Sequence, residues 1–200
     1  LSIYANTPEQ AASRLAQEGA DETAQGYLDA LIAARNGQTD NALQRLDQLA
    51  NQQPDFAMLP ASAASVALEA GQYDEAIQRS QRLLRFMPNY LPAQLILAEA
   101  QLQRDPQSAY NVLRDMADQH PENPQVFNLL AEAAGRSGHD GWGHLARAEH
   151  LQLTGRVDRG IRQLSIARDA AEREDDQQVV ARIEQRREAF IEYREALEDF

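Results

Sequence analysis

Histidine is the first residue type in this sequence whose chemistry could indicate catalysis or metal binding. The four histidines are His120, His139, His144 and His150, and the last three lie close together in the sequence. Zinc hydrolases place two histidines at positions i and i+4 of one helix, with a glutamate between them. The cluster does not have this spacing, so we expect surface or packing roles for it. A metal-dependent activity of the last three histidines is the weaker alternative.

Other common catalytic groups are missing from the sequence. All 19 basic residues are arginine, so the chain has no lysine for a Schiff base or a P-loop, and it has no cysteine. It contains neither a Gly-x-Ser-x-Gly elbow nor a glycine-rich phosphate loop. Acidic pairs such as Glu172 and Asp176 are typical of a solvated helix end. We therefore predict that these 200 residues are not an enzyme and hold no catalytic, cofactor-binding or metal-binding residues.

The charge of the chain argues against two classes of partner. It carries 31 acidic and 19 basic residues, for a net charge of −12. That charge is repelled by nucleic-acid phosphates and by anionic lipid surfaces. We also find no apolar run long enough to cross a membrane and no export signal. The sequence therefore predicts neither nucleic-acid binding nor direct membrane insertion.

The elements that would position any binding residues are predicted to be helices arranged as a repeat. Gly37, Ala42 and Pro54 recur as the same residue types 34 positions later, at 71, 76 and 88. This spacing is the period of the tetratricopeptide repeat, or TPR. The segment from Ala70 to Ile77 resembles the loop and second-helix start of such a repeat. Glycine permits the tight turn between helices, and proline cannot continue a helix.

We therefore predict an all-α fold: a TPR-type α-solenoid of antiparallel helix pairs, forming a single domain over residues 1–200. No complete second helix fits between Asn123 and the glycines Gly141 and Gly143, so one repeat is expected to be truncated to a single helix. The expected parts are an N-terminal capping helix at 1–22, repeats at 23–56, 57–90 and 91–123, a truncated repeat at 124–140, a further repeat at 141–174, and a long C-terminal helix at 175–200.

Stacked helix pairs present a concave surface, lined by the first helix of each pair, that usually binds peptides or proteins. The repeat register predicts that a partner-binding groove is lined by Tyr27, Arg35, Met58, Leu68, Glu69, Leu95, Glu99, Asn128, Glu132, Arg136, Trp142 and Glu149. This surface is mixed apolar and acidic. TPRs that clamp a terminal carboxylate need a cluster of Lys, Arg and Asn, and this groove offers two arginines among four glutamates, so such capture is disfavoured.

The same residues also have structural explanations. The leucines, with Leu31 beside them, can pack between helices, and the glutamates can form a solvated face. Tyr27, Met58 and Trp142 fit either interpretation, because aromatic side chains and methionine are common in interfaces. The sequence leaves these alternatives open.

One stretch carries a more particular resemblance. Leu145–Glu149, followed by Thr154–Asp158 and Ile161–Leu164, resembles the carboxy-terminal TPR domain of the BepA family, which are M48 zinc metallopeptidases of Gram-negative bacteria. Leu1–Tyr4, Tyr73–Ala76 and the truncated repeat fit the same family, but such motifs are shared by many TPR proteins. The resemblance covers nearly the whole chain, and only residues 145–164 are distinctive.

The resemblance implies a periplasmic recognition module of a metalloprotease. Zinc would be held by a His-Glu-x-x-His helix in a protease domain outside these residues, and no zinc ligand of the family maps onto this chain. The implied partners are outer-membrane β-barrel proteins, including the lipopolysaccharide-transport barrel, the β-barrel assembly complex, and the chain's own protease domain. The module would hold substrates for maturation or degradation and raise their effective concentration near the active site. The alternative is a stand-alone TPR scaffold of an envelope, pilus or secretion assembly.

Overall fold

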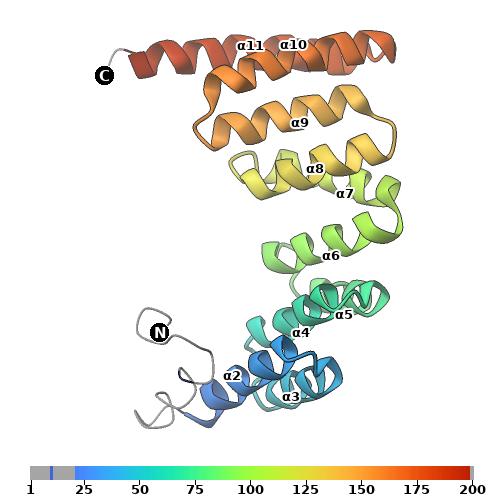
Figure 1. Ribbon diagram of the computed structural model, residues 1–200, viewed down its shortest axis with the longest axis vertical. Coiled ribbons are helices and arrows are strands. Elements are labelled where there is room, and N and C mark those ends of the chain that lie inside the picture. Colours follow the sequence, from blue (N-terminus) through green and yellow to red (C-terminus); the bar gives the residue numbers. More distant parts are fainter. Residues whose placement is uncertain (1–9, 11–20, 199–200) are drawn as a thin grey trace. The chain divides into compact units, whose positions relative to one another are not determined.

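The computed structural model describes residue 10 and residues 21–198, and the regular structure in this part of the chain is helical throughout (Figure 1). The predicted all-α fold class is therefore confirmed. The predicted N-terminal capping helix lies almost entirely outside the described residues. Contacts divide the chain into two compact units, residues 1–100 (unit 1) and residues 101–200 (unit 2).

Unit 1 is a set of antiparallel helices with an alanine-rich core. Its helices are α2 (Glu22–Arg35), α3 (Thr39–Gln52), α4 (Met58–Glu69), α5 (Tyr73–Phe86) and most of α6 (Leu91–Arg104). Helix α3 packs against both α2 and α4, and α5 packs against α4. Ala63, Ala67 and Ala76 are fully buried in this core. Such small side chains let neighbouring helix backbones approach closely, as the repeat pattern requires.

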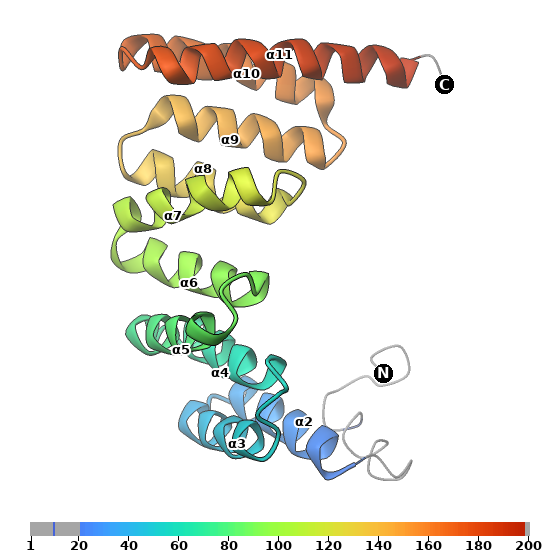
Figure 2. The ribbon, with the colours of Figure 1, turned by 180° about the vertical axis from the view of Figure 1, so that it is seen from behind.

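Unit 2 continues the same construction with larger core side chains. Its helices are α7 (Pro106–Gln119), α8 (Pro124–Arg136), α9 (Asp140–Leu153), α10 (Val157–Arg173) and α11 (Gln177–Glu198). Each packs against the next, and α11 runs along α10 while also contacting α9 (Figure 2). Leu145, Leu164, Ile183 and Phe190 form the centre of this core and are at most 2% exposed.

The two glycines predicted to turn the chain between helices, Gly37 and Gly71, do so, and two further glycines act in the same way. Positive φ angles occur at Gly37 (75°), Gly71 (72°), Gly138 (81°) and Gly155 (76°), each between two antiparallel helices. In the α4–α5 turn the amide of Gly71 donates to the Leu68 carbonyl at 2.9 Å. Because a left-handed backbone costs glycine no steric strain, these turns stay tight.

The turn from α6 to α7 has no glycine and is built by a helix cap instead. The Asp105 carboxylate accepts hydrogen bonds from the Ser108 hydroxyl at 2.6 Å and from the Ser108 amide at 3.2 Å. The bond from the hydroxyl is the main reason why the pKa of Asp105 lies below its usual value. Pro106 occupies the first helical position, where its missing N–H costs nothing.

Gly141 and Gly143 lie inside α9, which begins at Asp140, so each marks a close contact within a helix. A Cβ atom at Gly141 would lie 2.9 Å from the Cα atom of Ala171 on α10, and one at Gly143 would lie 3.4 Å from the Ala131 carbonyl oxygen on α8. Helix α9 therefore packs tightly on both neighbours. Which of them it pairs with as a repeat, and hence the boundary at 140, stays a prediction.

The predicted long C-terminal helix is present as α11. Its residues Val179, Ile183 and Phe190 are buried, but Leu197 is 53% exposed and extends past the core. The buried Phe190 ring lies against α10, where a Cβ atom at Gly160 would be only 3.0 Å from it. Within residues 21–198, none of the helices combines the length and the apolarity needed to cross a membrane.

Candidate protein-interaction site

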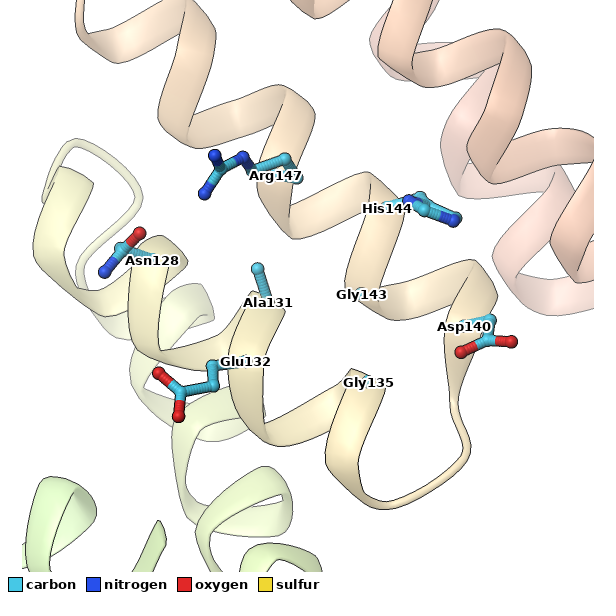
Figure 3. A pocket seen from close by; sticks show the side chains of 8 residues that line it. All are labelled: Asn128, Ala131, Glu132, Gly135, Asp140, Gly143, His144 and Arg147. Carbon is cyan, nitrogen blue, oxygen red and sulfur yellow. The ribbon is translucent and has the colours of Figure 1, made fainter.

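A pocket of about 360 Å³ opens between α8 and α9 of unit 2 (Figure 3). It contains two of the residues predicted to line a groove, Asn128 and Glu132. Its walls are formed by Asn128, Ala131, Glu132 and Gly135 from α8 and by Asp140, Gly143, His144 and Arg147 from α9. On each helix these residues are three or four positions apart, which is the spacing that places side chains on one helical face.

The small residues explain why this pocket exists. Because Gly143 lets α9 approach the α8 backbone closely, the polar side chains stand on either side of a shallow floor of Ala131, Gly135 and Gly143. A Cβ atom at Gly135 would meet no atom within 4 Å, so this part of the floor is open.

Some polar side chains of the pocket already have a hydrogen-bond or ion-pair partner among the described residues, and others do not. Glu132 lies 3.4 Å from the guanidinium of Arg136 on the same helix, and His144 Nδ1 accepts a hydrogen bond from the Gln163 amide at 2.8 Å. Asn128 and Arg147 are exposed, and no other described residue pairs with them. In Figure 3 these two side chains lie toward the same end of the pocket. An amide and a guanidinium placed together can bind the carbonyl and carboxylate oxygens of a peptide.

Two residues predicted for the groove in unit 2 lie on another face of α9. Glu149 is only 6% exposed, and its carboxylate accepts two hydrogen bonds from Arg186 of α11, at 2.6 and 2.9 Å. These bonds also raise the pKa of Arg186. The expectation that Glu149 faces a groove is therefore wrong. A buried carboxylate needs a partner, and α11 supplies one.

Trp142 is the second displaced residue. Its ring lies between two arginines, with Arg114 of α7 at 5.1 Å and Arg182 of α11 at 4.9 Å from the ring centroid. Arg182 is held in turn by Asp118 of α7 at 2.7 Å. These contacts stack a cation on the aromatic ring, an arrangement that stabilises both groups. Trp142 therefore joins α7 to α11 and does not line the α8–α9 pocket.

The residues predicted for the groove in unit 1 are spread over three helices. The Tyr27 hydroxyl lies 3.0 Å from the Ser62 hydroxyl and so links α2 to α4, and Leu68 packs against the core beside Leu31. These contacts agree with the structural interpretation of Tyr27, Leu68 and Leu31. The others are Arg35, Met58 and Glu69, which are exposed, and Leu95 and Glu99, which are half-buried. Whether they bind a partner stays a prediction.

Unit 1 also contains a larger pocket that the sequence did not predict. It occupies about 800 Å³ between the carboxyl-terminal halves of α3 and α5. Arg79 of α5 spans it and donates to both oxygens of Asp47 on α3, at 2.6 and 2.9 Å, while Glu75 accepts a third bond at 2.7 Å. These bonds, the ones to Asp47 first, raise the pKa of Arg79. The sequence signal that could have revealed this pocket is the apolar pair Phe86 and Met87 at a helix end. Neither residue was placed in the predicted groove.

The histidines have separate neighbours. His139 stacks on the Tyr110 ring with centroids 4.2 Å apart, and its Nε2 atom lies 3.2 Å from the Gln107 side-chain oxygen. His150 donates from Nδ1 to the Pro124 carbonyl at 2.8 Å. Among the described residues, no three side chains with metal-binding groups gather at one point. The contacts agree with packing roles for these side chains.

Comparison with known proteins defines the fold. No family model and no curated protein matches the sequence. MamA (residues 41 to the end) from Desulfovibrio magneticus RS-1 is 18% identical, with 86% of this chain aligned to 97% of that one and a TM-score of 0.59. TTC0263, a TPR protein of Thermus thermophilus, is 18% identical, with 82% aligned to 97% and a TM-score of 0.50. At these identities the likeness concerns the fold alone, and the chain is a TPR-type α-solenoid.

Proposed function

We propose that this chain is a non-catalytic module that binds other proteins. The observation that carries the proposal is the α8–α9 pocket, where Asn128 and Arg147 are exposed toward the same end, above an open floor. A pocket of about 360 Å³ is large enough for one or two side chains of a peptide. TPR helices usually serve as such scaffolds.

The chemistry of the pocket favours a peptide over a small metabolite. The Asn128 amide both donates and accepts hydrogen bonds, so it matches a peptide unit, while Arg147 can bind a carbonyl or carboxylate oxygen. Glu132 and Asp140 add negative charge along the same surface. A peptide laid across α8 and α9 would therefore meet donors where Asn128 and Arg147 lie and acceptors at Glu132 and Asp140.

The finer form of the proposal follows from the resemblance of residues 145–164 to the BepA family. In that form the chain is the recognition part of a periplasmic M48-type zinc metallopeptidase. It binds outer-membrane β-barrel proteins or their assembly complex for maturation or degradation. Incompletely assembled barrels expose unpaired strand edges, which seek partners. A stand-alone scaffold of an envelope, pilus or secretion assembly agrees equally well with the fold.

Binding to an unfolded barrel tests the pocket directly. A fluorescently labelled outer-membrane β-barrel, diluted from urea, is titrated with the wild-type chain and with the double variant Asn128→Ala, Arg147→Ala, and anisotropy is recorded. We expect the double variant to bind about ten-fold more weakly, because two polar anchors are lost. The matched control is Arg159→Ala, which removes an exposed arginine of α10 outside the pocket. Equal affinity of all three proteins would refute a role for the pocket.

The coding sequence upstream of Leu1 separates the two finer alternatives. A signal sequence and a His-Glu-x-x-His motif encoded there would support the metalloprotease setting. A reading frame without that motif would leave the stand-alone scaffold.

A further inference from the structure

The large exposed apolar side chains of unit 1 lie at two places in the chain. Among the described residues, four large apolar side chains of this unit are exposed: Phe56 (52%), Met58 (41%), Phe86 (80%) and Met87 (43%). Two lie in or beside the α3–α4 connection, and two lie where α5 ends. Neighbouring exposed apolar side chains such as Phe86 and Met87 are typical of interaction sites.

Two of these four side chains line the pocket between α3 and α5. Phe86 and Met87 line it directly, as do Asp55 and Ala57, which flank Phe56 in the sequence. Leu83, only 8% exposed, lies deeper among the lining residues. The pocket volume of about 800 Å³ is in the range of sites that accept several side chains. None of the four exposed side chains belongs to the core clusters of the unit, so their exposure does not serve the packing of the helices.

The charged residues around the pocket indicate which charge a bound segment would carry. Asp47 and Arg79 neutralise each other through their two short hydrogen bonds. Arg82 lines the α5 wall, is exposed, and has no carboxylate partner among the described residues. Arg85 is exposed one turn further along the same helix. Asp55 lies on the opposite wall. The α5 wall is therefore a cationic surface in a chain whose net charge is −12.

We propose that the pocket between α3 and α5 is a second docking site, and that it binds a protein segment presenting two large apolar side chains and a carboxylate. The apolar side chains enter beside Phe86 and Met87, and the carboxylate pairs with Arg82. Arginine favours such a contact because its planar fork matches carboxylate geometry. Asp55 repels a second carboxylate at the other wall and so orients the segment. This site shares no residue with the α8–α9 pocket and does not depend on the proposed function of that pocket.

Selection from a phage-displayed library of short random peptides tests the proposal on the whole chain. A peptide of the selected consensus is synthesised with a fluorescent label, and its affinity is measured by anisotropy. We expect a consensus with two large apolar residues and one Asp or Glu. The double variant Phe86→Ser, Met87→Ser should bind about ten-fold more weakly or worse, because apolar anchors dominate such contacts. Both side chains are exposed, so circular dichroism should show unchanged helicity.

A charge reversal tests the orientation of the segment. Arg82→Glu should weaken the binding of the acidic peptide by about ten-fold, and replacing the peptide's carboxylate by lysine should restore it. For the Phe86→Ser, Met87→Ser variant the matched control is Ile166→Ser, which removes an exposed apolar side chain (46%) from α10, outside the pocket. The Asn128→Ala, Arg147→Ala variant should bind the peptide normally, which separates this site from the α8–α9 pocket.

Three outcomes would overturn the proposal. The first is a consensus that is basic or lacks apolar residues, and the second is unchanged binding by the Phe86→Ser, Met87→Ser variant. The third is a wild-type dimer in sedimentation experiments that this variant abolishes, which would identify a second copy as the occupant. We expect no such dimer, because two copies of net charge −12 repel each other.

Discussion

The two units use aromatic rings and arginines in opposite ways. In unit 2, Phe190 is 1% exposed under the guanidinium of Arg186, which lies 5.2 Å from the ring centroid and pairs with the buried Glu149. In unit 1, Phe86 is 80% exposed, and Arg79 pairs with Asp47, whose side chain is 47% exposed. The same residue types build a core in one unit and border an open pocket in the other. Residue type alone therefore does not separate a structural side chain from a binding one. What separates them is whether a neighbouring helix covers the side chain.

The largest expected difference in unfolding free energy is between variants of the two phenylalanines. Phe190→Ala should lower the free energy of unfolding by about 3–5 kcal/mol, because it leaves a cavity against α10. Phe86→Ala should change it by less than about 0.5 kcal/mol, because its ring is already in water. Urea titrations followed by far-UV circular dichroism measure both values. Comparable losses would mean that Phe86 is covered in solution.

Removing the arginine of the ion pair should also lower the free energy of unfolding more in unit 2 than in unit 1, but by a smaller difference. Arg186→Ala should cost about 2–3 kcal/mol of unfolding free energy, because it leaves the Glu149 carboxylate buried without a partner. Arg79→Ala should cost about 1 kcal/mol or less, because water can hydrate Asp47. The double variant Glu149→Gln, Arg186→Met removes both charges and should recover much of the loss. If Arg79→Ala costs as much as Arg186→Ala, the contrast between the two pairs is wrong.

A further prediction tests the close approach of α9 to its neighbours. Gly141→Ala should destabilise unit 2 by about 1–3 kcal/mol, because the new Cβ atom would lie 2.9 Å from Ala171. Gly135→Ala should instead stabilise α8 by about 0.5 kcal/mol, because it meets open space and alanine favours helix. Thermal unfolding midpoints of the two variants should move in opposite directions.

Much of the fold could be predicted because the signals are local. The 34-residue spacing, the glycine turns and the prolines that follow helix ends each depend on a few neighbouring residues, and the structure has turns and helix ends at these residues. The candidate site was predicted only in part. Asn128 and Glu132 share a helical face, so their common position followed from periodicity. Arg147 and His144 were not predicted, because their contribution depends on how closely α9 approaches α8.

The sequence by itself therefore determined the fold class, the helix ends and the absence of common catalytic motifs, since these depend on residue types and short-range spacing. Only the tertiary structure decided which faces are covered. Helix α9 carries Glu149 and Trp142 as well as the pocket residues His144 and Arg147. Residues of α11 contact Glu149 and Trp142, whereas His144 and Arg147 line the pocket. The physical reason is that burial is set by neighbours distant in sequence. The free energy of pairing a carboxylate or an aromatic ring depends on those neighbours rather than on the helix that carries it.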